Sequence, residues 1–411
     1  MKIIIKIPSY REMVKIMIFS IIWYIEFCVR YFQISNALLL LGGALAFFLF
    51  LDFFSDGKSS FGRIPRAVWF LFIYEVYTLV FGAVVAPDFS AHVSQGIKMV
   101  EYTLVLFAIL YYAKTKGSIK FLVWNYAIMC TLMCFIFLYK PIFYHNNPLL
   151  GRMSFASSMN PNSFGMLMAM GSWSVLYLAS CKKIPMFLAI IISGLEVIAI
   201  FQSGSRKGII GILIIIALWI VLCYIPSTDS NKWHIKILKI AICLCTMITG
   251  LFILAPYYMD SNLAGRMAEL TKEASGGARN DMYVEGLKYF KKSPLFGYGL
   301  QGFSYFYGAY SHATIIEVPV SGGIIGTTLF LAMCIEIFFS IIKKLIHCRN
   351  VFDLQSFIRP RMALVLLGSM AFYSIAMIHI YEISSYIYVG LIIALYTLNT
   401  TSVFMEDEYE D

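Results

Sequence analysis

Charged side chains are scarce in this sequence. Lys, Arg, Asp and Glu form 13% of the 411 residues, whereas an ordinary soluble domain contains about 25%. Hydrophobic residues form 60% of the chain, and no soluble core could bury that much apolar surface. The shortage of charge therefore excludes an ordinary soluble globular protein and predicts a chain that lies largely in the lipid bilayer.

Paired cysteines are also missing. The nine cysteines lie in or beside apolar segments, no two have C-x-x-C spacing, and none falls within residues 256–315. This pattern argues against a disulfide framework and against a zinc site. We expect the cysteines to be small buried apolar residues, and we expect neither a bound metal nor a cofactor.

Long apolar runs recur along the whole chain. A run of roughly twenty residues crosses a hydrocarbon core as a helix. We therefore predict an all-α fold, a single polytopic membrane domain over residues 1–411 with about twelve transmembrane helices. The first run is too long for a signal peptide and lacks a cleavage site, so we expect it to be retained. The predicted spans are 12–29, 33–52, 66–86, 96–113, 119–139, 162–181, 184–203, 208–226, 235–256, 316–342, 361–381 and 384–404.

The formal net charge of +9 is concentrated in alternate short loops, so it indicates orientation rather than a nucleic-acid partner. By the positive-inside rule, both termini are cytoplasmic in a multi-pass protein of the cytoplasmic (inner) membrane. The large hydrophilic loop, residues 256–315, then lies on the non-cytoplasmic side. The short loops and helix ends on that outer side carry few cations: Arg30, Lys98, Lys140, Arg152, Arg206 and Lys207.

The tight turn Ser203–Gly208 places two adjacent cations, Arg206 and Lys207, on the outer side. Charges near the membrane usually have a partner there. The small residues around Arg206 and the N-terminal amides of the next helix would suit an anion. An alternative is a hairpin whose cations extend to lipid phosphates.

A second feature is an amphipathic helix within the large loop. Arg279, Tyr283, Leu287 and Phe290 share one helical face, and Pro294 ends the helix. Arg279 stands at the helix start, where the dipole disfavours a cation. This position indicates an anionic ligand, or else a salt bridge to Asp281 or Glu285.

The third feature is His312, immediately before the span at 316–342. A histidine at a membrane interface can act as a general base near neutral pH. A structural role at the interface is the alternative.

Together these features resemble the O-antigen ligase and polymerase superfamily of membrane glycosyltransferases. The resemblance extends over residues 200–330 and depends on four motifs in a fixed order. One departure is Ala313, where the family most often has Asn. The motifs are S-x-S-R-x-G at Ser203–Gly208, R-x-x-x-[WY] at Arg279 and Tyr283, P-L-x-G-x-G at Pro294–Gly299, and H-x-x-x-[IL]-x6-G at His312, Ile316 and Gly323.

The resemblance implies a metal-independent glycosyl transfer from a polyprenyl-diphosphate-linked oligosaccharide to a glycan acceptor on the outer face. Compatible catalytic roles are diphosphate binding by Arg206 and Arg279 and acceptor activation by His312. Membrane lipids surround the chain, and a flippase and a chain-length regulator are further candidate partners. Secondary candidates for substrate binding are Lys207, Arg266, Tyr283 and Glu317.

Two activities fit this chemistry. The segment Asn160-Pro161-Asn162, after Gly151-Arg152, resembles one more typical of polymerases than of ligases. This resemblance favours an O-antigen or capsular polysaccharide polymerase over a ligase that transfers the glycan to lipid A-core, although the segment could also be a capped helix start. A flippase or transporter would instead use intramembrane acids. It would leave the ordered outer loop unexplained. The acids concerned are Glu26, Glu75, Glu101, Glu196 and Glu336.

Overall fold

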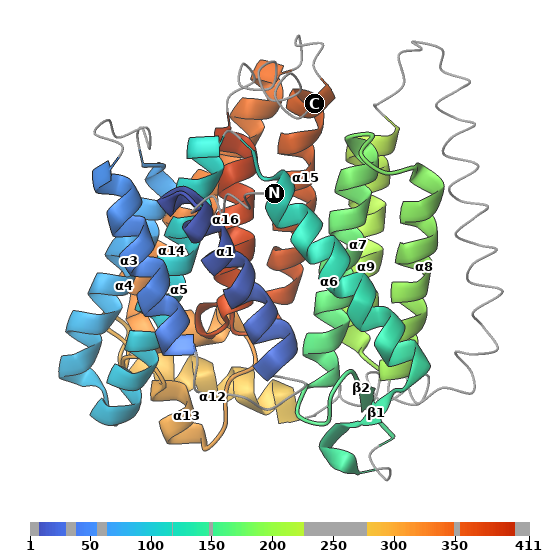
Figure 1. The fold of residues 1–411 in the computed structure, drawn as a ribbon. Helices are drawn as coiled ribbons and strands as arrows, with labels where there is room; N and C mark the ends of the chain where they lie inside the picture. Colours follow the sequence, from blue (N-terminus) through green and yellow to red (C-terminus); the bar gives the residue numbers. More distant parts are fainter. Residues whose placement is uncertain are drawn as a thin grey trace.

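A computed structural model describes residues 8–29, 38–55, 64–116, 118–147, 151–225, 278–348 and 354–398. Long helices stand side by side, and the two ends of the molecule differ (Figure 1). One end carries the short elements β1, β2, α12 and α13, and the labels of both chain termini lie toward the other end. The all-α membrane class predicted from the sequence is confirmed.

In the described part of its first half, the chain forms five long helices before a small two-stranded sheet. α1 continues directly into a π-helical turn, Tyr24–Cys28. The two strands pair antiparallel, with Ile142 opposite Ser154. These elements are α1 (Tyr10–Trp23), α3 (Leu38–Ser55), α4 (Arg66–Val85), α5 (Phe89–Lys116), α6 (Lys120–Tyr139), β1 (Ile142–Phe143), the 3₁₀ turn Tyr144–Asn146 and β2 (Met153–Ser154).

The second half adds the helices that surround the site. α7 is buried along almost its whole length and packs against α6, α8 and α9, so it lies at the centre of its half of the bundle. The elements are α7 (Pro161–Ser180), α8 (Met186–Ser203), α9 (Arg206–Trp219) with the π turn Ile220–Tyr224, α12 (Ala278–Lys292), α13 (Gly302–Tyr307), α14 (Thr314–His347), α15 (Leu354–Tyr373), the 3₁₀ turn His379–Tyr381 and α16 (Ile383–Thr397).

Every predicted span that falls among the described residues contains a helix, and the window 235–256 lies outside them. Six described helices are long and apolar enough to cross a membrane: α4, α5, α6, α8, α9 with its π turn, and α14. The total of about twelve spans stays a prediction.

One predicted span is wrong at its end. The window 361–381 was expected to be helical, but α15 ends at Tyr373 and a turn with a single 3₁₀ step leads to α16. Ile375, Ala376, Met377 and Ile378 are apolar enough to resemble helix in a hydropathy profile. This segment, residues 374–382, is named the 374–382 turn below.

The α7–α9 contact is close because two glycines face each other. A Cβ atom on Gly208 would lie 2.8 Å from the Cα of Gly165, and one on Gly165 would lie 2.6 Å from Ser205 Oγ. Ser205 caps α9 by accepting a hydrogen bond from the Gly208 amide, 3.1 Å. The Ser203–Gly208 turn is therefore held against the start of α7.

A break in α14 receives the P-L-x-G-x-G segment. Gly323 has φ +61° and ψ −160°, a conformation open almost only to glycine. The Tyr298 and Gly299 amides donate to the Val320 and Ser321 carbonyls, both at 2.9 Å, and the Ile324 amide donates to Pro294 O, 2.7 Å. The motif thus fastens the loop before α13 to the middle of a helix.

The buried acids meet hydroxyl groups from other helices. Thr103 donates to Glu75, 2.6 Å, and Ser172 donates to Glu196, 2.5 Å. Ser384 donates to Glu26. Each of these acids joins two helices, so a structural role accounts for them without a transport pathway.

Candidate functional site

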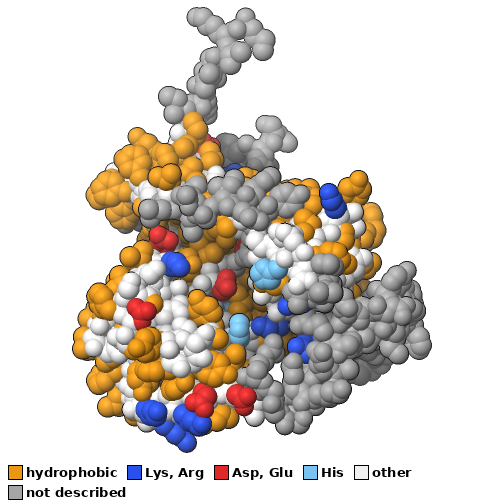
Figure 2. All heavy atoms as spheres, turned by 90° about the horizontal axis from the view of Figure 1, so that it is seen from below, with side chains coloured by type: hydrophobic (Ala, Val, Ile, Leu, Met, Phe, Trp, Pro, Cys, Tyr) orange, Lys and Arg blue, Asp and Glu red, His pale blue; other side chains and the backbone are white. Residues whose placement is uncertain are grey.

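A polar cavity of about 600 Å³ opens at the end of the bundle that carries α12 and α13. That volume is typical of a ligand site. Seen from this end, basic, acidic and histidine side chains gather around a hollow near the middle, while apolar side chains dominate the flanks (Figure 2). The cavity is lined by Gln95, Lys98, Tyr102, Arg152, Asn160, Asn162, Ser163, Met166, Lys207, Gln301, Tyr310, His312, Ala376, Met377, Ile378, Tyr381 and Glu382.

The ionisable lining is mainly cationic. Lys98, Arg152 and Lys207 line the cavity together with His312, and Glu382 is the acid among the lining residues. These five side chains come from segments far apart in the sequence, and the fold brings them to one volume. Three cations around a cavity of this size suit a multiply charged anion such as a diphosphate.

His312 is held in an unusual backbone conformation. Its φ is +54°, in the left-handed region, which costs energy for a residue with a side chain. The flanking Ser311 is buried and donates to Glu317 Oε2, 2.6 Å. The side chain of His312 itself is exposed to the cavity, so the strained backbone presents the imidazole to a ligand.

Glu317 is buried behind the cavity and contacts two residues that shape it. Besides Ser311, it accepts a hydrogen bond from the Tyr381 hydroxyl, 3.0 Å. Tyr381 in turn accepts a hydrogen bond from the Gln301 amide, 3.0 Å. Burial raises the pKa of Tyr381 well above its ordinary value, so the hydroxyl keeps the proton that it donates to Glu317.

The 374–382 turn is fastened to the start of α14. The Thr314 amide donates to both the Ser374 and the Met377 carbonyls, each at 2.8 Å. The Thr314 hydroxyl donates to Met377 O, 2.6 Å, and accepts from the His379 amide, 2.8 Å. These bonds fix the turn next to His312, although about sixty residues separate them.

Asn162 connects three segments at the wall of the polar cavity. Its Oδ1 accepts from Arg152 Nη2 and from Ser205 Oγ, both at 3.3 Å. Asn160 caps α7 by accepting from the Asn162 amide, 2.9 Å. The Asn-Pro-Asn segment is thus a helix cap, as one interpretation predicts, and both asparagines also line the cavity.

The two cations of the Ser203–Gly208 turn differ in position. Lys207 lines the cavity, and its ammonium group donates to the Ala376 carbonyl. Arg206 is the first residue of α9 and is 8% exposed, and it is not among the lining residues. Arg206 is therefore a buried residue of the turn rather than part of the cavity lining.

The predicted amphipathic helix is present as α12, which packs on α14. The Tyr283 hydroxyl donates to the Ile375 carbonyl, 2.7 Å, so the helix also contacts the 374–382 turn. Arg279 lies in the first turn of α12, and its side chain is outside the described part. Arg266 lies outside the described residues.

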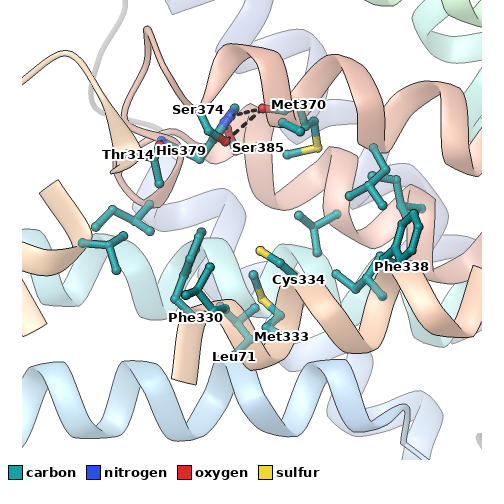
Figure 3. A pocket seen from close by; sticks show the side chains of 18 of the residues that line it. Leu71, Thr314, Phe330, Met333, Cys334, Phe338, Met370, Ser374, His379 and Ser385 are labelled. Carbon is teal, nitrogen blue, oxygen red and sulfur yellow. Dashed lines mark hydrogen bonds between the residues drawn. The ribbon is translucent and has the colours of Figure 1, made fainter. Parts of the chain in front are cut away.

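An apolar cavity of about 660 Å³ lies on the other side of the 374–382 turn (Figure 3). Residues of α14, α15 and α16 line it, among them Phe330, Met333 and Phe338. His379 and Ile380 face this cavity, whereas their neighbours Ile378 and Tyr381 line the polar one. One turn of chain therefore separates a cationic site from an apolar one.

His379 closes the polar end of the apolar cavity in neutral form. Its Nε2 donates to the Met370 carbonyl, 2.9 Å, and its Nδ1 accepts from the Ser385 hydroxyl, 2.8 Å. Burial lowers the pKa of His379 to about 4, although the bond to Met370 opposes that shift.

Several lining residues were not selected from the sequence. Lys98 and Arg152 were visible as cations on the sparsely charged outer side, which was a usable signal. Glu382 and Ala376 gave no such signal in the sequence, because the predicted span 361–381 assigned most of their segment to a helix. Gln95 and Gln301 are uncharged and far apart in the chain, and only the fold brings them together, with Gln301 Nε2 3.4 Å from Gln95 Oε1.

Comparison with known proteins agrees with the resemblance seen in the sequence. A search of curated proteins gives no match. A family model described as O-antigen ligase matches residues 187–331, from α8 into α14. The matched region includes Lys207, His312 and Glu317 together with the segment that fastens to the break in α14. Over these residues the chain is similar to the O-antigen ligase family, in agreement with the superfamily resemblance that its motifs predict.

Proposed function

We propose that this protein is a polysaccharide polymerase that joins undecaprenyl-diphosphate-linked repeat units on the outer face of the cytoplasmic membrane. The observation that carries the proposal is the pair of cavities, one cationic and one apolar, separated only by the 374–382 turn. A lipid-linked diphosphate sugar has the same division into a charged head and an apolar chain. The O-antigen ligase family match supports a donor of this class.

The polar cavity would hold the diphosphate. Lys98, Arg152 and Lys207 line it and would neutralise the phosphate oxygens. Arg206, next to Lys207 at the start of α9, and Arg279, at the start of α12, would stabilise the negative charge that grows on the leaving group. Cations in these positions would allow the reaction to proceed without a metal ion.

The isoprenoid chain would lie in the apolar cavity. The lining is almost entirely hydrocarbon and sulfur, and Ile315, Leu331 and Phe338 at its α14 side are exposed on the flank of the bundle. A chain in this cavity would join the surrounding bilayer without crossing a polar surface. Its diphosphate end would meet the 374–382 turn.

The transfer itself is a displacement at the anomeric carbon. The oxygen of an acceptor sugar hydroxyl forms a bond to that carbon, and the bond from carbon to the phosphate oxygen breaks. The electron pair leaves with the lipid diphosphate, and the hydroxyl proton passes to a base. His312 would orient or deprotonate the acceptor hydroxyl, because its side chain is exposed within the cavity.

The Asn160–Asn162 segment favours the polymerase over the ligase. Asn160 and Asn162 line the polar cavity, where a second lipid-linked repeat would bring its non-lipid sugar. Such a polymerase would act beside a flippase that delivers the repeats and a regulator that limits chain length.

Deletion of the gene, in a host that displays the glycan on lipopolysaccharide, tests the choice of acceptor. A gel of the extracted lipopolysaccharide should show lipid A-core with one repeat unit at most, because unpolymerised repeats are still ligated. Bare core, with polymer accumulating on the polyprenyl carrier, would make the protein a ligase. Bare core, with unpolymerised repeats trapped on the cytoplasmic face, would make it a flippase.

Alanine substitutions test the proposed site. Arg206→Ala, Arg279→Ala and His312→Ala should each abolish glycan assembly at normal levels of inserted protein. Arg206→Lys and Arg279→Lys should also be poorly active, since a point charge cannot reproduce a bidentate contact with phosphate. Near-normal activity in all three alanine variants would remove the assignment. Lys183→Ala, in the exposed turn at the opposite end of the bundle, is the matched control.

A further inference from the structure

We propose that Glu382 is the base that accepts the proton of the attacking hydroxyl, with His312 orienting that hydroxyl. This inference rests on the proposed function and assigns its proton-transfer step. Glu382 lines the polar cavity together with His312 and three cations. Its carboxylate is therefore placed where a donor and an acceptor would meet.

The Glu382 side chain does not serve the helix that follows it. Glu382 is the N-cap residue of α16, a position where a carboxylate commonly accepts hydrogen bonds from the first amides. Here no side-chain cap hydrogen bond is present. Its backbone is fixed on both sides, with its amide donating to His379 O, 3.2 Å, and its carbonyl accepting from the Ser385 amide, 3.0 Å.

The backbone on the N-terminal side of Glu382 is fixed by side chains. The preceding Tyr381 is hydrogen-bonded to Glu317 and to the Gln301 amide. His379, three residues back, is bonded through its amide and both ring nitrogens. A carboxylate on so constrained a segment is preorganised, as a catalytic base requires.

Charge decides which part of the substrate Glu382 serves. A carboxylate repels a diphosphate, so the part of the cavity wall at Glu382 does not bind the phosphates of the donor. Sugar hydroxyls donate well to carboxylates. The N-terminal end of the α16 dipole also favours a negative charge at this position before the acceptor binds.

The proton transfer lowers the electrostatic cost of the reaction. As the acceptor oxygen bonds to the anomeric carbon, its proton moves to a Glu382 oxygen and the carboxylate becomes neutral. In the same step, negative charge grows on the departing lipid diphosphate. Neutralising Glu382 therefore removes a repulsion when it would be greatest. His312, surrounded by cations, is less suited to gaining a positive charge and more suited to orienting the hydroxyl.

Azide provides a test that a structural role would not pass. The full-length protein, in a bilayer, is given lipid-linked repeat units extracted from the deletion strain. Glu382→Ala should release lipid diphosphate about 10²–10⁴-fold more slowly than the unaltered protein, the usual contribution of a general base. Added azide needs no deprotonation, so it should attack the anomeric carbon and restore release in Glu382→Ala, with a glycosyl azide as the product.

The controls separate this inference from the proposed function. Glu101→Gln, an acid of α5 that lines a different, small cavity, should behave like the unaltered protein. Lys207→Ala should be slow and should not respond to azide. Near-normal release by Glu382→Ala, or slow release without azide rescue, would overturn the role of Glu382. No release by the unaltered protein would instead contradict the proposed function.

Discussion

Glu317 is the residue on which the geometry of the site depends most. It is fully buried and accepts hydrogen bonds from the hydroxyls of Ser311 and Tyr381. One bond fixes the residue before His312, and the other fixes the residue before Glu382. A single carboxylate thus positions both proposed participants in proton transfer.

Substitutions at Glu317 should separate hydrogen bonding from charge. In Glu317→Leu the Tyr381 hydroxyl loses its acceptor, and the Ser311 hydroxyl keeps only the longer bond to the Ala313 carbonyl. A buried unsatisfied group costs about 1–3 kcal/mol. In Glu317→Gln the amide oxygen can still accept from Tyr381, and the amide N–H can donate to Ser311, whose hydroxyl has the Ala313 carbonyl, 3.2 Å away, as a second acceptor. We expect Leu to lower the midpoint of thermal unfolding in detergent by several degrees and Gln to lower it much less.

Equal loss of thermal stability in the two Glu317 variants would contradict this interpretation. Glu285→Gln is the control, because Glu285 forms an ion pair with the exposed Lys288, at 2.6 Å. It should leave the midpoint unchanged, as exposed pairs contribute little.

Site residues were predictable from the sequence where a residue type is unusual for its position. Lys207 stood out as a cation on the wrong side by the positive-inside rule, and His312 as a titratable group at a membrane interface. Both line the cavity. Glu382 did not stand out, because an acid just before an apolar run is what a helix N-terminus usually has. Its orientation toward the cavity depends on three-dimensional contacts.

Among the elements, the broken helix α14 organises the end of the bundle that carries the polar cavity. The loop from Pro294 to Gly299 pairs with its backbone on both sides of Gly323. That loop leads through α13 to His312, so the break determines where the histidine lies.

Two neighbouring glycines give a matched test of this break. A Cβ atom at Gly323 would lie 2.3 Å from the Leu295 carbonyl oxygen, and its φ of +61° is strained for any side chain. At Gly322 the nearest atom would be 3.6 Å away, an ordinary contact. We expect Gly323→Ala to lose more than about 3 kcal/mol of stability and most glycan assembly, whereas Gly322→Ala retains both. Similar levels of folded protein, measured by gel filtration in detergent, would contradict the role of the break.

The 374–382 turn should make the protein acid-sensitive. His379 has an ordinary pKa of 6.5 and a folded-state pKa of about 4, so the unfolded chain binds the proton first as the pH falls. Stability should therefore fall between about pH 6.5 and pH 4, by something of the order of 3 kcal/mol from this residue. Thermal unfolding midpoints over this range should show the decline. His379→Gln should be less stable at neutral pH and should lack this part of the decline. An unchanged fall of the unfolding midpoint with pH in this variant would contradict the role of His379.

Helices were predictable from the sequence because apolar runs of span length have few alternatives in a bilayer. Their ends were less so. The apolar residues of the 374–382 turn resemble a helix in composition, and the bonds from Thr314 that hold the turn come from another helix. The end of α12 was predictable because Pro294 is a local signal in the sequence. The contact of α12 with Ile375 was not predictable, because it joins distant parts of the chain.

For the molecule as a whole, the structure places the Ser203–Gly208 turn, the 374–382 turn and His312 at one end. The charge pattern predicts that this end is outside the cell membrane. Ser205 is fully buried. A cysteine at this position would therefore not show on which side of the membrane the turn lies. Asp281 on α12 and Lys183 between α7 and α8 are exposed at opposite ends.

Single cysteines at these two positions, in a background without the native ones, should therefore differ. Asp281→Cys should react with an impermeant thiol reagent in spheroplasts, and Lys183→Cys should react only after the membrane is permeabilised. Reaction of Lys183→Cys alone in intact spheroplasts would place the cavity on the cytoplasmic side and exclude an outer-face transfer.

The most direct measurement follows the donor through the polar cavity. Purified protein in a bilayer is incubated with lipid-linked repeat units from the deletion strain, and the released undecaprenyl diphosphate and the length of the lipid-linked glycan are measured together. The unaltered protein should release one lipid diphosphate for each repeat added, and His312→Ala and Arg206→Ala, both folded and inserted, should release almost none. Chain growth at an undiminished rate in both variants would contradict the assignment of this cavity as the site of glycosyl transfer.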